Sequence, residues 1–181
     1  SCKNNLYYIS MVTWFIGLSR SGKSTLSKIL YDKLKLKVDN LILIDGDIIR
    51  NILGNDLGHT IEDRRENARR ISQLTKFLAD QNIHVIAAVL SIFPEWQKWN
   101  RENIKNYSEI YLKVPMEVLK QRDKNGLYIE AEKGNIKNVV GVDIPFPEPI
   151  HSDLIIDNDR NDHNYEKMIS KVLELEKIKN I

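Results

Sequence analysis

The chain of 181 residues is long enough to bury the core of one domain and too short for two domains of ordinary size. Its 27 Lys and Arg residues are nearly balanced by 25 Asp and Glu residues, and the net charge of +2 argues against a nucleic-acid partner. The single cysteine, Cys2, excludes an internal disulfide framework. No apolar run reaches membrane-spanning length and the first residues lack a secretory pattern, so we expect a cytoplasmic protein without a membrane partner.

Residues 1–10 precede the first expected strand, and we treat them as an extension or a non-native remnant ahead of a single domain over 11–181. Apolar runs predict strands, in chain order, at residues 12–16, 41–44, 84–93, 109–114 and 153–157. Helices are predicted, in chain order, over 24–35, over 60–82, after the third strand, from Pro115 and at the C-terminal end. This alternation predicts an α/β fold with a parallel sheet covered by helices on both faces.

The longest predicted helix begins after Thr60, which we expect to cap it ahead of the acidic Glu62 and Asp63. Its apolar residues recur with the helical repeat expected of one helix face, at Ile71, Leu74, Phe77 and Leu78.

The segment "GLSRSGKST" after the first strand fits the phosphate-loop pattern G-x-x-x-x-G-K-[ST]. Its glycines allow backbone N–H groups to turn toward phosphate oxygens, Lys23 can reach the outer phosphates, and the Ser24 hydroxyl can hold Mg²⁺. The strand–loop–helix context makes an ordinary glycine-rich turn a poor alternative. We therefore predict that the loop binds a nucleoside triphosphate with Mg²⁺, held by Gly17, Ser19, Arg20, Ser21, Gly22, Lys23, Ser24 and Thr25.

The second strand runs into "DGD", which places Asp45 and Asp47 at the carboxyl edge of the sheet, where ligands bind in such folds. A GTPase is disfavoured because no N-K-x-D element is present, and an ATPase machine would show one acidic residue at this strand end rather than two. A carboxylate can orient or deprotonate an acceptor hydroxyl, and Arg50 can clamp an anionic group on the same molecule. The pattern therefore favours a small-molecule kinase over a nucleotide-binding regulator without turnover.

Five motifs in this order resemble the adenylylsulfate kinase family: "GLSxSGKST", "DGDxxR", "LG-x-x-x-x-DR-x-EN-x-RR", "RD-x-x-GLY" and "G-x-D-x-P". The resemblance runs from about Met11 to Asp159. It implies transfer of the γ-phosphoryl group of MgATP to the ribose 3′-hydroxyl of adenylyl sulfate in sulfate assimilation. It also implies a fold like that of nucleoside monophosphate kinases, with a five-stranded parallel sheet and a mobile lid, and it makes a homodimer an expectation.

The resemblance also assigns roles to individual positions. Asp47 would orient or deprotonate the acceptor hydroxyl, with Asp45 supporting it or the metal shell and Lys23 acting on the phosphates. Arg122 would lie near ATP, and the lid would begin around Gly126. The acceptor nucleotide would be bound by Asp47, Arg50, His59, Arg64, Asn67, Ser91 and Phe146, the last of which would pack on the base.

Four positions depart from the family pattern, and most of them line the acceptor side. Arg20 stands where the family usually has glycine, His59 replaces a phenylalanine that stacks on the acceptor base, Ile92 replaces a proline, and Asn125 replaces a lysine. If Arg20 needs a positive φ, the strain costs on the order of 1 kcal/mol. Two acceptors therefore stay open: adenylyl sulfate first, and another nucleotide such as the cytidine diphosphoramidate used in capsule assembly second.

Several residues have structural alternatives to these roles. Asp45 could merely cap a turn, and Ser91 could be an ordinary hydroxyl at a strand end. For the arginines of the long helix we expect a solvated, salt-bridged role at two of four positions and a functional role at Arg64, the four being Arg64, Arg65, Arg69 and Arg70. Three histidines without metal-ligand spacing are expected to be solvated: His84, His151 and His163.

Overall fold

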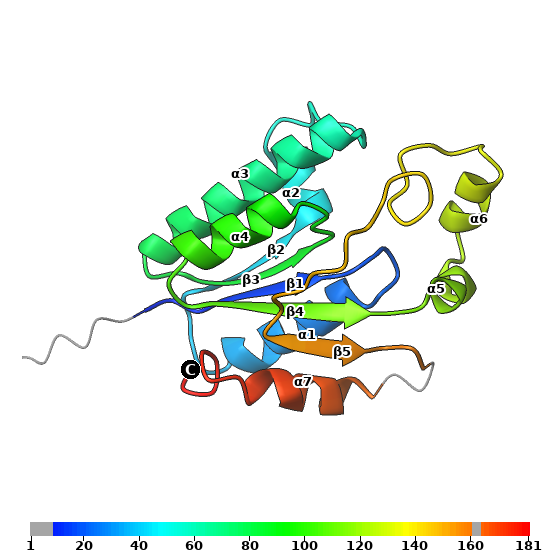
Figure 1. The fold of residues 1–181 in the computed structure, drawn as a ribbon. Coiled ribbons are helices and arrows are strands. Elements are labelled where there is room, and N and C mark those ends of the chain that lie inside the picture. Colours follow the sequence, from blue (N-terminus) through cyan, green and yellow to red (C-terminus); the bar gives the residue numbers. More distant parts are fainter. Residues whose placement is uncertain (1–8, 161–163) are drawn as a thin grey trace, which may run out of the picture.

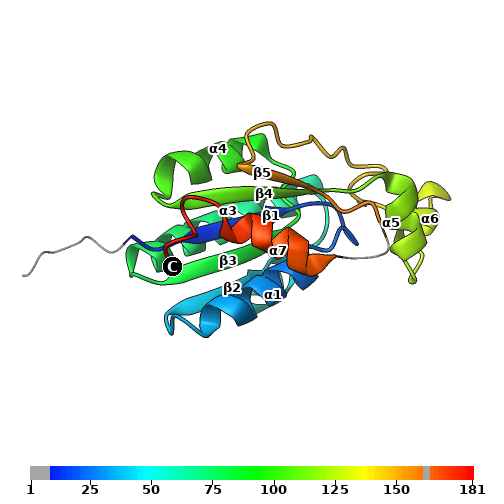
Figure 2. The same ribbon diagram turned by 90° about the horizontal axis from the view of Figure 1, so that it is seen from below.

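The computed structural model describes residues 9–160 and 164–181, and it has three layers, with a five-stranded sheet between two sets of helices. α3 and α4 cover one face of the sheet and α1 and α7 cover the other, as the two views in Figures 1 and 2 show. The prediction of a parallel α/β sheet with helices on both faces is confirmed. Residues 1–8 and His163, about which the sequence made predictions, lie outside the described residues.

The strands are β1 Val12–Ile16, β2 Leu41–Asp45, β3 His84–Val89, β4 Tyr107–Lys113 and β5 Leu154–Asp157. The helices are α1 Lys23–Lys35, α2 Gly46–Ile52, α3 Ile61–Asp80, α4 Pro94–Asn103, α5 Met116–Arg122, α6 Leu127–Glu132 and α7 Tyr165–Leu173. Among the described residues, none of these helices combines the length and apolar character that crossing a bilayer requires.

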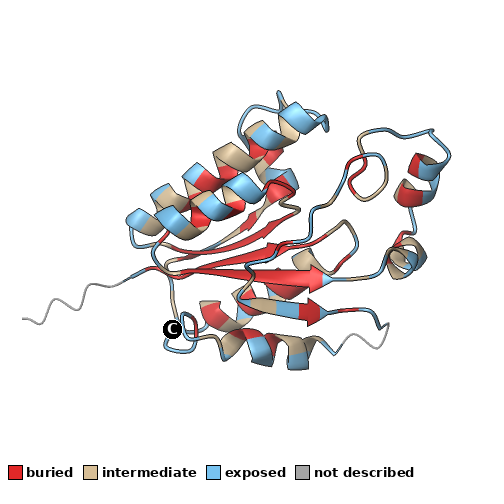
Figure 3. Ribbon diagram, viewed as in Figure 1, coloured by how far each residue is buried: buried red, intermediate tan, exposed pale blue. Residues whose placement is uncertain are grey.

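The strand order is β2-β3-β1-β4-β5, and every neighbouring pair is parallel. β1 therefore lies in the centre, where Val12 pairs with Val85 on one side and with Tyr107 on the other. All five residues of β1 are buried, as a central strand between two helical layers requires (Figure 3). The phosphate loop follows this strand, so the most deeply packed part of the sheet supports it.

Alternate residues of β1, together with Met11 directly before it, supply the two cores. Met11 and Phe15 pack with α1 and α7, whereas Trp14 and Ile16 pack with α3 through Ile71. Each layer of helices thus closes on a separate apolar surface, and the sheet is fixed from both sides. This leaves the carboxyl edge of the sheet as the place where loops and polar side chains gather.

Three local predictions were wrong. The third strand ends at Val89, four residues before the predicted end of the apolar run, because the chain turns at Ser91, whose φ is 54°. His84 is fully buried, and its Nδ1 accepts a hydrogen bond from the Met11 amide at 2.9 Å, so it is not solvated. Phe77 on α3 is 60% exposed and lies off the buried face.

Helix α3 begins as predicted. The Thr60 side chain accepts a hydrogen bond from the Asp63 amide at 3.1 Å, which satisfies one of the free N–H groups of the first turn. At the other end of α3, the buried Ser10, which precedes β1, donates its hydroxyl to the Ala79 carbonyl at 2.9 Å. These contacts fix both ends of the long helix that carries Arg64 and Asn67.

Candidate active site

The loop between β1 and α1 has the backbone geometry that an anion cradle needs. A Cβ at Gly17 would lie 2.6 Å from Ser21 Oγ and 3.0 Å from the Leu112 carbonyl oxygen. Gly22 has a φ of 103°, and a Cβ there would lie 2.8 Å from Asn158 Nδ2. Both glycines of the motif are therefore required by space or by backbone conformation, and the N-terminus of α1 follows directly.

Arg20 adopts the left-handed conformation, with a φ of 70°. A non-glycine residue in this region costs on the order of 1 kcal/mol. Its Nε lies 3.3 Å from Oδ1 of Asp123, a carboxylate whose side chain is only 1% exposed. This ion pair offsets part of the strain and directs the guanidinium toward the start of α6.

Lys23 is half-buried at the start of α1, and its Nζ donates to the Leu18 carbonyl at 3.0 Å. Burial lowers the pKa of Lys23 from 10.5 to about 8, and the nearby carboxylates of Asp47 and Asp45 oppose this shift only in part. A half-buried ammonium group whose charge is only partly compensated is suited to receive an anion such as a phosphate.

The two acids of "DGD" have different structural roles. Asp45 is the N-cap of α2, and its Oδ1 accepts hydrogen bonds from the amides of Asp47 and Ile48 at 2.9 and 3.3 Å. Its other oxygen accepts a bond from the Ser24 hydroxyl at 3.3 Å. Asp45 therefore both caps a helix and contacts the phosphate loop, whereas the Asp47 side chain is 86% exposed and contacts Arg50 Nη1 at 3.2 Å.

A single cavity of about 290 Å³ joins the phosphate loop to the "DGD" acids. Ten of the residues singled out from the sequence line it: Ser19, Lys23, Ser24, Asp45, Asp47, Arg50, His59, Arg64, Asn67 and Ser91. Residues 136–140 also line this cavity; a lid was expected from around Gly126, but none of these five residues was predicted individually as a site residue.

The acceptor side of the cavity is rich in positive charge. Arg50 is only 8% exposed, and the half-buried Arg64 donates to the carbonyl oxygens of His59 and Asn138, both at 2.9 Å. Burial, and next the proximity of Arg50, lower the pKa of Arg64. One buried and one half-buried guanidinium group at this wall suit a ligand that carries anionic groups.

His59 lies against Arg50, with its Nδ1 3.2 Å from Arg50 Nη1. Burial, followed by the charges of Arg50 and Arg64, lowers the pKa of His59. The ring is therefore neutral near pH 7, and because a guanidinium only donates, Nδ1 accepts this bond and Nε2 carries the proton.

Ser91 and Asn67 are held by the scaffold at the edge of the same cavity. The Trp14 indole N–H donates to Ser91 Oγ at 2.8 Å, so the serine is tied to the central strand. Asn67 Nδ2 donates to the Gly46 carbonyl at 3.4 Å, and within the described part of the chain its Oδ1 has no hydrogen-bond partner. That buried oxygen is a candidate acceptor for a ligand hydroxyl or amine.

Phe146 and Arg122 are not brought to the cavity. Phe146 packs on Tyr111, with ring centroids 5.9 Å apart. Arg122 donates to the carbonyl oxygens of Asn158 and Arg160 at 2.6 and 3.1 Å, on the far side of the phosphate loop. Their roles toward the acceptor base and ATP stay predictions.

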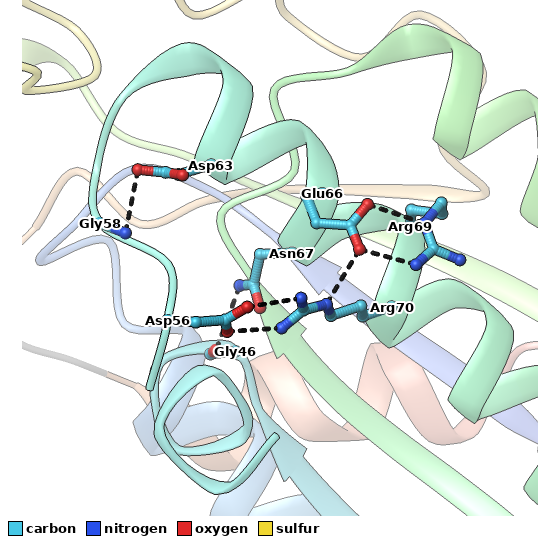
Figure 4. Close-up of polar contacts among 8 residues, drawn as sticks. All are labelled: Gly46, Asp56, Gly58, Asp63, Glu66, Asn67, Arg69 and Arg70. Atoms are coloured by element: carbon cyan, nitrogen blue, oxygen red, sulfur yellow. Dashed lines mark hydrogen bonds and ion pairs between the residues drawn. The ribbon is translucent and has the colours of Figure 1, made fainter. Parts of the chain in front are cut away.

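Most of the remaining arginines of α3 serve structure. Arg70 pairs with Asp56 at 2.8 Å and with Glu66 at 2.9 Å, and Arg69 pairs with the same glutamate (Figure 4). Hydrogen bonds from these arginines lower the pKa of Asp56 to about 2 and that of Glu66 to about 2. Since Arg65 pairs with Glu95, three of the four arginines are salt-bridged rather than the predicted two, and Arg64 is left for the cavity.

Comparison with known proteins now identifies the family. The model of the adenylylsulphate kinase family matches residues 9–157. The chain belongs to the adenylylsulphate kinase family. Within it, the chain is 45% identical over 166 residues to the cytidine diphosphoramidate kinase of Campylobacter jejuni, covering 92% of this chain and 94% of the relative.

Other members of the adenylylsulphate kinase family are similar over slightly less of the chain. The adenylyl-sulfate kinase of Paraburkholderia xenovorans is 39% identical over 150 residues, covering 82% of this chain and 84% of that one. The solved structure of the Mycobacterium tuberculosis APS kinase in complex with AMPPNP and APS superposes with a TM-score of 0.79 at 32% identity, covering 91% of this chain and 98% of that one. The chain is accordingly a P-loop phosphotransferase with a hydroxyl acceptor.

Proposed function

We propose that this kinase transfers the γ-phosphoryl group of ATP to the ribose 3′-hydroxyl of a nucleotide. The observation that supports this most directly is the single cavity bordered by Lys23 and Ser24 on one side and by Asp47 on another. Donor and acceptor can meet in such a space without a large movement of the sheet. The relative solved with AMPPNP and APS supports a triphosphate donor and a nucleotide acceptor in this family.

The residues of the phosphate loop fit a triphosphate. The tight approach at Gly17, the positive φ of Gly22 and the half-buried ammonium of Lys23 are what a cradle of inward amides requires. Ser24 would hold Mg²⁺, and Asp45 accepts a hydrogen bond from the Ser24 hydroxyl. ATP, when bound, would supply the phosphoryl group, and the Mg²⁺ bound with it would neutralise part of the charge on the phosphates.

The protein's own contribution to the reaction is positioning and charge. Lys23 and the loop amides stabilise negative charge that develops on the transferred group. Asp47 orients the incoming hydroxyl and takes its proton, which its exposed position in the cavity allows. Arg50 and Arg64 hold the anionic part of the acceptor, while Asn67 and Ser91 lie where they can bond its sugar or base.

For the acceptor itself we favour cytidine diphosphoramidate, with adenylyl sulfate as the second candidate. The cytidine diphosphoramidate kinase of Campylobacter jejuni shares 45% identity over nearly the whole chain. The neutral His59, where the family usually has a stacking phenylalanine, offers a smaller ring and an N–H donor to the base. Adenylyl sulfate remains supported by the retained family motifs and by relatives of 39% identity that carry that name.

The acceptor can be tested by supplying purified protein with MgATP and either acceptor and measuring ADP release. We expect turnover with cytidine diphosphoramidate to exceed turnover with adenylyl sulfate. The variant His59→Phe, which restores the usual family residue, should shift the kcat/KM ratio of the two acceptors toward adenylyl sulfate. Faster turnover of adenylyl sulfate by the unaltered protein would reverse the assignment.

The position of transfer needs a separate measurement with deoxy analogues of the better acceptor. A 2′-deoxy analogue should be phosphorylated, whereas a 3′-deoxy analogue should bind without ADP release. Phosphorylation of the 3′-deoxy analogue would show that another hydroxyl is the acceptor. Neither result would change the proposal that ATP binds at the phosphate loop.

A further inference from the structure

A phosphate loop can turn its amides toward an anion only when its carbonyl oxygens turn outward. Each outward carbonyl that is buried then needs a hydrogen-bond donor from elsewhere in the protein. The Leu18 carbonyl accepts hydrogen bonds from within the loop region, from the Ser21 amide at 3.1 Å and from Lys23 Nζ at 3.0 Å. The carbonyls of Ser19 and Ser21 are instead served by side chains distant in sequence.

The Ser19 carbonyl accepts a hydrogen bond from the Tyr128 hydroxyl at 2.6 Å. Tyr128 lies on α6, its side chain is fully buried, and its ring packs against Leu119, Val139 and the loop residue Leu18. Burial raises the pKa of Tyr128 to about 12, so the hydroxyl remains a donor at neutral pH. The ring has no freedom to move away from the loop without opening this apolar cluster.

The Ser21 carbonyl accepts a hydrogen bond from Asn158 Nδ2 at 2.8 Å. Asn158 directly follows β5, is only 1% exposed, and its own carbonyl is held by Arg122. The absence of a Cβ at Gly22 makes this approach possible, since a Cβ there would lie 2.8 Å from the same nitrogen. The second glycine of the motif therefore serves the side chain behind the loop as well as the loop conformation.

We propose that Tyr128 and Asn158 are positioning residues that hold the Ser19 and Ser21 carbonyls outward and so keep the intervening amides turned toward the triphosphate. The inference rests on ATP binding at this loop, as proposed above. It also links the loop to α6, whose first turn is capped by Asp123 through a 2.9 Å bond to the Tyr128 amide. Asp123 in turn pairs with Arg20 of the loop, so two contacts join these elements.

The alternative is that both side chains merely stabilise the fold, and matched controls separate the two explanations. Tyr107 is also a buried tyrosine, with its hydroxyl 3.1 Å from Glu109 Oε1, but it lies at the start of β4, at the opposite end of the sheet from the phosphate loop. Tyr128→Phe and Tyr107→Phe remove the same atom. Both should lower the melting temperature, and only the first should weaken nucleotide binding.

Binding of AMPPNP with Mg²⁺, measured by calorimetry, is the decisive readout. For Tyr128→Phe we expect Kd to rise about tenfold, the size of one lost buried hydrogen bond. In turnover assays KM for ATP should rise similarly, while KM for the acceptor stays within about twofold.

Asn158→Leu tests the other carbonyl and does not depend on the first variant folding. It keeps the approximate size of the side chain, adds no charge beside the phosphate loop and removes the donor to the Ser21 carbonyl, so AMPPNP affinity should fall by about tenfold. Asn100→Leu, at an asparagine that is equally 1% exposed on α4, is its control and should leave that affinity unchanged.

Each result has one meaning. If the unaltered protein fails to bind AMPPNP, the proposed function is wrong and this inference falls with it. If the unaltered protein binds and the variants at Tyr128 and Asn158 bind as tightly as the controls, only the inference is wrong. A selective loss of affinity at both positions supports it.

Discussion

Asp47 and Asp45 lie two residues apart, yet the structure predicts opposite outcomes for their removal. In Asp47→Asn the side chain keeps its size and loses its charge. Because this side chain is 86% exposed and its ion pair within the described residues is with Arg50, we expect the free energy of unfolding to change by less than about 1 kcal/mol. Loss of a positioned base should lower kcat by roughly 10² to 10⁴, which corresponds to about 3 to 5 kcal/mol in the barrier.

The assay follows ADP release at saturating MgATP and acceptor, with urea denaturation and AMPPNP binding measured on the same preparations. AMPPNP affinity of Asp47→Asn should match that of the unaltered protein, since Asp47 is assigned to the acceptor. Asp45→Ala is the contrasting variant, because it removes the N-cap of α2 and should cost about 1 kcal/mol of stability. Retention by Asp47→Asn of more than about a tenth of kcat would refute its role as the base.

Three further predictions concern the donor, the acceptor and the scaffold. The pKa of Lys23 is about 8 in the folded protein and 10.5 in the unfolded chain, so between these pH values the unfolded state binds more protons. The free energy of unfolding, measured without Mg²⁺, should therefore rise with pH across this window, by on the order of 2 kcal/mol after allowing for partial exposure. Urea titrations should show this rise for the unaltered protein and not for Lys23→Met. Arg64→Ala should raise KM for the acceptor by about 10- to 100-fold in steady-state kinetics and leave the AMPPNP Kd unchanged. Thr60→Ala should lower the unfolding free energy by about 1 kcal/mol in urea, and an unchanged midpoint would contradict its capping role.

Much of the architecture could be predicted because it follows from local sequence patterns. The first strand has the predicted bounds, Val12–Ile16, since an apolar run that ends at a glycine-rich loop has few alternatives. Helix α2 was not predicted, because its local sequence pattern is weak. It is only seven residues long, and its Ile48 and Ile52 are 59% and 69% exposed, so no apolar face marks it.

The site was predictable where it depends on motifs and hidden where it depends on tertiary contacts. Lys23, Ser24 and the "DGD" acids carry their chemistry in their spacing. Tyr128 and Asn158 reach the phosphate loop across 109 and 137 residues of sequence, and neither their type nor their spacing reveals it.

The central position of β1 has a consequence for synthesis of the protein on the ribosome. This strand and the phosphate loop are translated before the sheet partners of Val12, which are Val85 and Tyr107. A nascent chain that stops short of β4 leaves one edge of a largely apolar strand unpaired and available to chaperones or to other chains. Pairing between segments so far apart also slows folding, so nucleotide binding becomes possible only once β3 and β4 have been made.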